Sequence, residues 1–263
     1  MTLDWSRANV LSLTEFEVCW DLLRLGETPW QLDPPHLGRT HEERHRIITD
    51  TIAELQVRGV GDARGPRPHL AEQLRLLADP ESELDVRFRD RTLTAAVVAR
   101  RGPHATLAVR HRDEIAVLEI PPTAAALALA ELLSPVRPGH GSRVQLPADV
   151  LDAARAAVPN DPDRFAIELR RLGIHAAAAH GLVQMCTGID QHGQFGATAR
   201  SRSGRTCRAP YVVGIHRIPS GHFMQLRRST SDGHAVVTVE PMSRQTLLRH
   251  LDELTGSRLE PAR

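Results

Sequence analysis

The sequence contains no lysine, so all 33 of its basic residues are arginine. Its aromatic residues are three Trp, one Tyr and five Phe, too few for a broad platform on which nucleic-acid bases would stack. The three cysteines, Cys19, Cys186 and Cys207, lie far apart and form no C-x-x-C pair. This spacing argues against a disulfide framework or a cysteine zinc site, and it favours a reducing compartment.

Long apolar runs are also missing. The longest, from Ala124 to Leu133, is rich in alanine and too short to cross a bilayer. The first residues, MTLDWSRANV, lack the basic start and apolar core of a signal peptide. With 41% hydrophobic and 25% charged residues, the composition is typical of a globular protein. We therefore expect a cytoplasmic protein without membrane insertion.

Helices come first along the chain and strands follow. Thr14 and Glu17 fit a capping box at the start of a helix that ends at Gly26, and Thr40 with Glu43 fits a second box. Further helices are predicted over 40–59, 70–77 and 122–133, and the strands of an antiparallel meander over 84–89, 92–100, 105–110 and 114–120.

The same order returns after the Pro/Gly-rich stretch SPVRPGHGSR. Helices are predicted over 148–157, 164–172 and 175–182, strands over 182–189, 195–201, 209–217, 222–228 and 235–240, and a closing helix over 241–254. The sequences VLEIP and VTVEP end the two sets of strands, and Leu127 and Leu247 each lie six residues past the proline. This pattern indicates an internal duplication. We expect an α+β fold with two pseudo-twofold-related halves, 1–138 and 139–263, in one domain over 1–263, each half an antiparallel β-sheet with a helical bundle.

The segment His41-Glu42-Glu43-Arg44-His45 satisfies the zinc-protease pattern H-E-x-x-H. A catalytic zinc needs a third protein ligand, and Ile48 and Thr51 stand where the extended motif has Gly and His. Glu72 is the nearest remaining candidate. Because Glu43 already serves as the partner of Thr40 in a helix cap, a helix start is the better interpretation. A zinc-dependent hydrolase stays as an alternative.

Between Asp190 and Asp232 the chain has no acidic residue. The seven arginines of this stretch are Arg200, Arg202, Arg205, Arg208, Arg217, Arg227 and Arg228. Alternation along a strand places Arg200 and Arg202 on one face, so one face of the second sheet is expected to be positive. An arginine-rich nucleic-acid-binding protein is a second alternative, but the stretch has few stacking groups and no RNP-like pattern, so no nucleic acid is expected as a partner.

A series of short motifs, in order over nearly the whole chain, resembles the EspG family of type VII (ESX) secretion chaperones of actinobacteria. The matching stretches are LTEFEVCWDLLRLGETPWQL (13–32), THEER (40–44), LQVRGV (55–60), the P-x-L helix from Pro68 to ADP at Pro80, ELDVR (83–87), VVARRG (97–102), GHGSRVQLP (139–147), QFGATARSRSGRTCRAP (194–210), GHF (221–223) and VEP (239–241).

The resemblance implies a fold of two quasi-symmetric halves and a non-enzymatic role without catalytic residues, metal or cofactor. Such proteins are cytosolic chaperones that bind the apolar tip of helical PE–PPE pairs and deliver them to the type VII secretion machinery. The implied clients are PE–PPE-like pairs or other helical substrates of the WxG class.

The resemblance also implies two partner-binding regions. One is the loop between the second and third strands of the first sheet, a short one here, Arg100-Arg101-Gly102-Pro103-His104. The other is the C-terminal helical bundle, in which Phe165, Leu169 and Leu172 are the expected contacts. Core packing is an equally good interpretation of these three residues.

Overall fold

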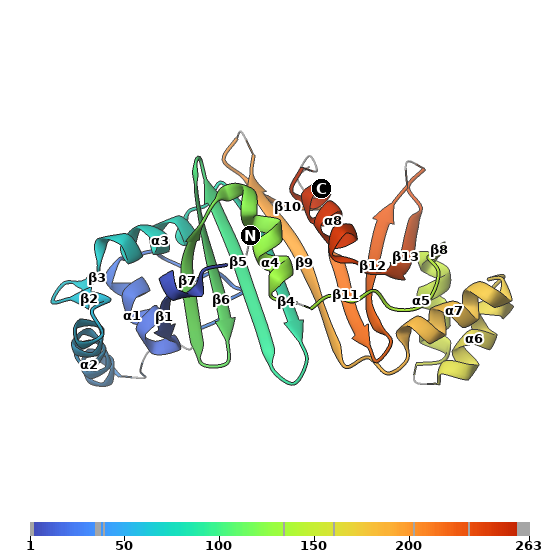
Figure 1. Ribbon diagram of the computed structural model, residues 1–263, viewed down its shortest axis with the longest axis horizontal. Helices are drawn as coiled ribbons and strands as arrows, with labels where there is room; N and C mark the ends of the chain where they lie inside the picture. The colour runs from blue at the N-terminus through green and yellow to red at the C-terminus, as the bar shows by residue number, and fades with distance from the viewer. Residues whose placement is uncertain are drawn as a thin grey trace. The chain divides into compact units, whose positions relative to one another are not determined.

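The computed structural model describes residues 3–34, 38, 40–133, 135–159, 161–201, 203–230 and 232–256 (Figure 1). Backbone contacts divide the chain into two compact units. The first unit comprises Met1–Arg87, Thr92–Glu131 and Thr198–Thr206, and the second comprises Phe88–Arg91, Leu132–Ala197 and Cys207–Arg263. None of the helices in the described ranges is both long enough and apolar enough to cross a membrane.

The first unit consists of an antiparallel sheet and helices on it. The strands are β1 (Asn9–Ser12), β4 (Ser82–Arg89), β5 (Leu93–Arg101), β6 (His104–His111) and β7 (Glu114–Ile120), in the spatial order β1-β7-β6-β5-β4, with a small hairpin of β2 (Gly61–Asp62) and β3 (Gly65–Pro66). The helices are α1 (Leu13–Leu22), α2 (His41–Val57), α3 (Pro68–Ala78) and α4 (Ala125–Glu131), with 3-10 turns at Trp5–Arg7 and Pro122–Ala124.

Strand β5 is buried on both faces because helices cover both. Val97 and Ala99 belong to the core that α1 and α3 complete. Ala96 and Val98 alternate with them and are buried on the other face, and α4 also packs against β5. Small side chains such as alanine allow the helices to approach the sheet closely.

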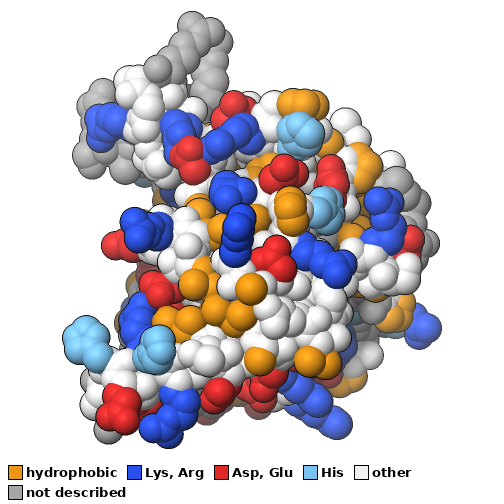
Figure 2. Space-filling model, turned by 90° about the vertical axis from the view of Figure 1, so that its left-hand side faces the viewer, with side chains coloured by type: hydrophobic (Ala, Val, Ile, Leu, Met, Phe, Trp, Pro, Cys, Tyr) orange, Lys and Arg blue, Asp and Glu red, His pale blue; other side chains and the backbone are white. Residues whose placement is uncertain are grey.

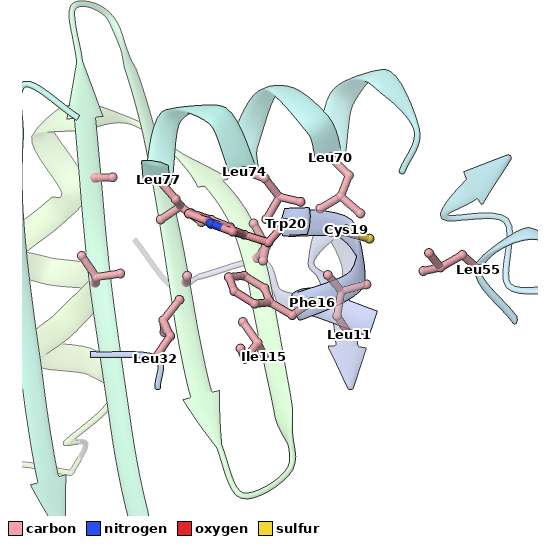
Figure 3. Close-up of a cluster of buried hydrophobic side chains, with 14 residues drawn as sticks. Leu11, Phe16, Cys19, Trp20, Leu32, Leu55, Leu70, Leu74, Leu77 and Ile115 are labelled. Carbon is pink, nitrogen blue, oxygen red and sulfur yellow. The ribbon is translucent and has the colours of Figure 1, made fainter. Parts of the chain in front are cut away.

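The core of the first unit centres on two stacked rings of α1 (Figure 3). Phe16 and Trp20 lie one turn apart, with their ring centroids 5.4 Å apart. Leu70, Leu74 and Leu77 point down on them from α3. The indole N–H of Trp20 donates to the carbonyl oxygen of Gly26 (3.0 Å), so its one polar atom is satisfied inside the core.

The second unit repeats the order of elements. Its strands are β8 (Val144–Pro147), β9 (Gln191–Arg200), β10 (Thr206–Arg208), β11 (Val213–Ile218), β12 (Gly221–Ser229) and β13 (Ala235–Pro241), with β9-β11-β12-β13-β8 as the order of the longer ones. Its helices are α5 (Ala148–Ala157), α6 (Pro162–Arg171), α7 (Ala176–Cys186) and α8 (Arg244–Gly256). In each unit a short strand leads directly into a helix and pairs with the last strand of the meander.

Most predicted elements are confirmed, including the α+β class and the antiparallel pairing. Two predictions are wrong. The cap of α1 is Ser12 with Glu15, because β1 ends at Ser12 and delivers that residue, rather than Thr14, to the helix start. Residues 182–189 are not a strand, since α7 continues to Cys186 and turns Leu182 and Met185 into the core. The short strands β1 and β8 were not predicted.

Candidate functional site

The HEERH segment is the start of helix α2. The hydroxyl of Thr40 accepts the backbone N–H of Glu43 (3.1 Å), as the capping pattern predicts. His41 and His45 are exposed, and Arg44 pairs with Asp21 (2.7 Å). Among the described residues, no three His, Cys, Asp or Glu side chains are grouped so that they could hold a metal ion. The geometry around this segment therefore does not fit a zinc site.

Four of the seven arginines of the acid-free stretch pair with acids that lie outside it. Arg217 pairs with Asp190 (2.8 Å), Arg227 with Asp152 (2.9 Å) and Arg228 with Glu253 (2.8 Å). Arg200 pairs with Asp79, and Arg202 lies outside the described residues. The positive charge expected on the second sheet is thus neutralised at these four arginines, because tertiary contacts bring in carboxylates from outside the stretch.

The predicted loop over Arg100–His104 is the tight hairpin between β5 and β6. Arg101 and His104 are opposite each other in the register of β5 and β6, so the two turn residues are Gly102 and Pro103. Gly102 has a φ of +53°, a conformation that glycine adopts at little cost at the first position of such turns.

The tip of this hairpin is anchored by the connection between α3 and β4. The backbone N–H of Gly102 donates to Oε2 of Glu81 (3.1 Å), and Nε of Arg100 donates to the hydroxyl of Ser82 (3.1 Å). Arg101 and Arg200 both contact the Asp79 carboxylate, and hydrogen bonds from Arg101 and then from Arg200 lower the pKa of that carboxyl. The hairpin therefore presents its arginines from a preorganised position.

The three residues predicted on the C-terminal bundle differ in exposure. Leu169 is fully buried in the core of the second unit. Phe165 and Leu172 are half-buried against the same core. Ile167, on the outer side of α6, has 62% of its surface exposed and was missed by the sequence interpretation.

A groove of about 470 Å³ lies beside α6 in the second unit. Its walls come from α5, α6, the end of α7 and the segment that follows, with Arg155 and Asp161 among the lining residues. The apolar lining residues are Leu151, Val158, Pro159, Pro162, Phe165, Leu182, Val183, Cys186, Ile189 and Val239. Ile189 is 45% exposed, so apolar surface continues from the groove to its edge.

The polar and reactive groups at the groove have structural roles. Asp161 caps α6 by accepting the N–H of Arg164 (3.0 Å). Burial raises the pKa of the Cys186 thiol to about 11, so the thiol is protonated at neutral pH and is a poor nucleophile. The wall formed by Leu182, Val183 and Cys186 escaped prediction because this run was interpreted as a strand.

The surface shown in Figure 2 carries a mixture of charged and apolar side chains, unlike the groove beside α6. Over its described part, basic and acidic side chains are interspersed, with small orange patches between them. Val57, at the end of α2, is 90% exposed. A mixed surface of this kind is ordinary for a soluble domain.

Comparison with known proteins gives one family and one fold. The sequence profile described as the EspG family matches residues 12–253. No curated protein has a sequence that matches the chain. Among solved structures, the chain is similar to the type VII secretion system chaperone EspG5 of Mycobacterium tuberculosis, solved in complex with a PE25–PPE41 dimer, with a TM-score of 0.75, 17% identity, and coverage of 94% of this chain and 95% of that chain.

Proposed function

This chain belongs to the EspG family, and we propose on that premise that it is a cytosolic chaperone of type VII secretion. In this role it binds a helical client pair of the PE–PPE kind, or another helical substrate of the WxG class, and presents it to the secretion machinery. The role is non-enzymatic and needs no cofactor. The solved relative EspG5 holds a PE25–PPE41 dimer, which supports this class of client.

The groove beside α6 is the observation that carries the proposal. Its lining is mostly apolar, and Ile189 at its edge is 45% exposed. An apolar client tip placed there would remove this surface from water, at about 25 cal/mol for each Å² buried. Phe165 and Leu172 would contact the client directly, while Leu169 would support α6 from below.

The hairpin tip over Arg100–His104 is the second proposed contact. Its position is held by Glu81, Ser82 and Asp79, so little conformational entropy is lost when a partner binds. Charged residues at such a tip favour a client with matching charges and penalise one without them. Apolar burial in the groove would supply affinity, and the arginines would supply selectivity.

Co-purification from the native cytosol tests the proposal. The tagged chain should bring down a stoichiometric helical pair, identified by mass spectrometry. Ile189→Asp, at the edge of the groove, should reduce the yield of that pair at least about tenfold, since a buried unpaired carboxylate costs well over 1.4 kcal/mol. Val57→Asp is the matched control, because Val57 is also exposed but lies on α2 of the first unit.

The outcomes separate the role from the site. If the wild-type chain brings down no helical pair under conditions that express type VII substrates, the chaperone role is wrong. If it brings down a pair that Ile189→Asp retains in full, the role stands and the groove beside α6 is not the binding site.

A further inference from the structure

A second cavity of the second unit lies on the face of the sheet that carries α8. It encloses about 340 Å³ between β8, β12, β13 and α8. Side chains alternate along β12, so Gln225 faces the apolar groove while Leu226 and Arg228 face this cavity. The cavity is therefore separate from the groove proposed for the client.

The floor of the cavity is a fixed polar network. Arg228 donates to Oε2 of Glu253 (2.8 Å) and to the hydroxyl of Tyr211 (3.2 Å), and its guanidinium lies 4.4 Å from the centre of the Tyr211 ring. His250 is buried, with Nδ1 3.1 Å from Oε2 of Glu253. These contacts leave Arg228 and Glu253 largely occupied with each other.

Two further arginines are only loosely paired with acids, and Arg143 also donates to Oε1 of Gln145 (3.4 Å). Nε of Arg143 is 3.8 Å from Oε2 of Glu240, and Nη1 of Arg249 is 3.6 Å from Oε1 of Glu253. Both distances exceed the length of a hydrogen bond. The side chains of Arg143 and Arg249 are 62% and 59% exposed, so their N–H donors are accessible to a ligand.

Charge and shape indicate the kind of ligand. The cavity is lined by three guanidinium groups and two carboxylates, an excess of one positive charge while His250 is neutral. Nε2 of His250 lies 3.3 Å from Nη2 of Arg249 and 3.7 Å from Oε1 of Glu240. With the imidazole proton on Nδ1, Nε2 of His250 accepts a hydrogen bond from Arg249, while Arg143 approaches Glu240.

An open groove along the outer face of α8 meets this cavity. It is lined by Arg244, Gln245, Leu248, Arg249, Asp252 and Glu253, so Arg249 and Glu253 border both. A polypeptide lying along α8 could pack on Leu248 and place one side chain in the cavity.

We propose that this cavity binds an acidic side chain of a protein partner, whose carboxylate accepts hydrogen bonds from Arg143 and Arg249 while the adjoining backbone lies along α8. Charge-assisted hydrogen bonds from two guanidinium groups are strong and directional. Arg228 and Glu253 act as positioning residues for the cavity floor. The inference is independent of the client site beside α6.

NMR titration of the full chain tests this site. The probe is a short blocked alanine peptide with one central glutamate, and its glutamine counterpart is the matched ligand control. The glutamate peptide should shift the ring resonances of His250 and leave those of His216 unchanged. The glutamine peptide should bind at least about tenfold more weakly, because a neutral amide forms weaker hydrogen bonds with guanidinium groups.

Protein variants complete the test. Arg143→Gln and Arg249→Gln should each weaken binding of the glutamate peptide about tenfold, the loss expected for one charge-assisted hydrogen bond. Arg46→Gln, on the exposed side of α2 in the first unit, should bind as the wild type does. Equal binding of both peptides, equal binding of acetate and the glutamate peptide, or unchanged binding in both variants would overturn the proposal.

Discussion

The carboxylate of Glu15 is buried near the edge of the first sheet, where it serves two partners. Its Oε2 accepts the backbone N–H of Ser12 (2.7 Å), and Nη1 of Arg58 lies 2.6 Å from both of its oxygens. Arg58 also donates to the carbonyl oxygen of Val10, on β1. The pair thus caps α1 and occupies polar groups of an edge strand that would otherwise be open to other strands.

Loss of Arg58 should destabilise the first unit. Arg58→Ala leaves the Glu15 carboxylate, whose side chain is 4% exposed, without its cation. We expect the free energy of unfolding in urea to fall by about 1–3 kcal/mol, the upper figure being limited by the partial exposure of Arg58.

A surface pair provides the control. Arg44 and Asp21 are both about two-fifths exposed, 43% and 41%, so Arg44→Ala should cost at most about 1 kcal/mol. Equal losses in the two variants would mean that burial of Glu15 adds nothing to the interaction.

Among the elements, the segment before β8 crosses β12 at very short range. The backbone N–H of Gly139 donates to the carbonyl oxygen of His222 (3.0 Å). A Cβ atom on Gly139 would lie 2.1 Å from the ring of Phe223, and one on Gly221 would lie 2.6 Å from the backbone nitrogen of Gly139. The motifs GHGSRVQLP and GHF therefore meet at a crossing that only glycine permits.

Gly139→Ala should destabilise the second unit by about 2 kcal/mol or more, because Phe223 is fully buried and cannot yield without loss of packing. Thermal or urea unfolding measures the loss. Phe223→Leu in the same chain should recover part of it, since a smaller side chain leaves room for the new methyl group.

Gly181, inside α7, is the contrasting position. A Cβ atom there would have only one neighbour within 4 Å, at 3.8 Å. Gly181→Ala should raise the free energy of unfolding by about 0.5–1 kcal/mol through helix propensity. If both glycine variants behaved alike, the close approach at Gly139 would not be the cause.

Element boundaries show how far prediction could go. Both ends of β7, Glu114 and Ile120, were predicted correctly, because turn residues bound its apolar run on both sides. The end of α7 was assigned to a strand because a short apolar run has no period that separates helix from strand. Only the packing of Leu182 and Met185 against the sheet decides that this run is helical.

At the scale of the whole molecule, acidic pH should lower the folding stability of the second unit more than that of the first. Burial lowers the pKa of His216, His222 and His250, all in the second unit. Below their ordinary value of 6.5 the unfolded chain binds protons that the folded chain does not. The stabilisation is therefore complete above that pH and is lost as the pH falls toward the lowered values of the folded state.

Hydrogen exchange can measure this difference. Between about pH 7.5 and about pH 5.5, the range in which histidines titrate, amide protection corrected for the intrinsic rate should fall more in the second unit than in the first. His216 is one of the groups whose packing links the helices to the sheet of the second unit. Its Nε2 lies 2.8 Å from the carbonyl oxygen of Met185, and its ring stacks on the ring of Phe223. An equal fall in both units would contradict the expectation.

Local pattern and order of elements could be determined from the sequence by itself. The helix start at Thr40, the meander strands, the α+β class and the family resemblance all rest on residues close together in the chain. The boundaries of the two proposed halves, 1–138 and 139–263, stay a prediction. The resemblance pointed to the hairpin over Arg100–His104 and to α6 as contacts, which are likewise still to be tested.

Tertiary structure decided which side chains are available and what they meet. Leu169 and Ile167 are two residues apart on one helix, yet one is buried in the core and the other faces water. Within the acid-free run, Arg227 and Arg228 are neutralised by Asp152 and Glu253, acids that lie outside the run. Burial and charge pairing depend on distances in space, and the pattern of neighbours along the chain does not contain them.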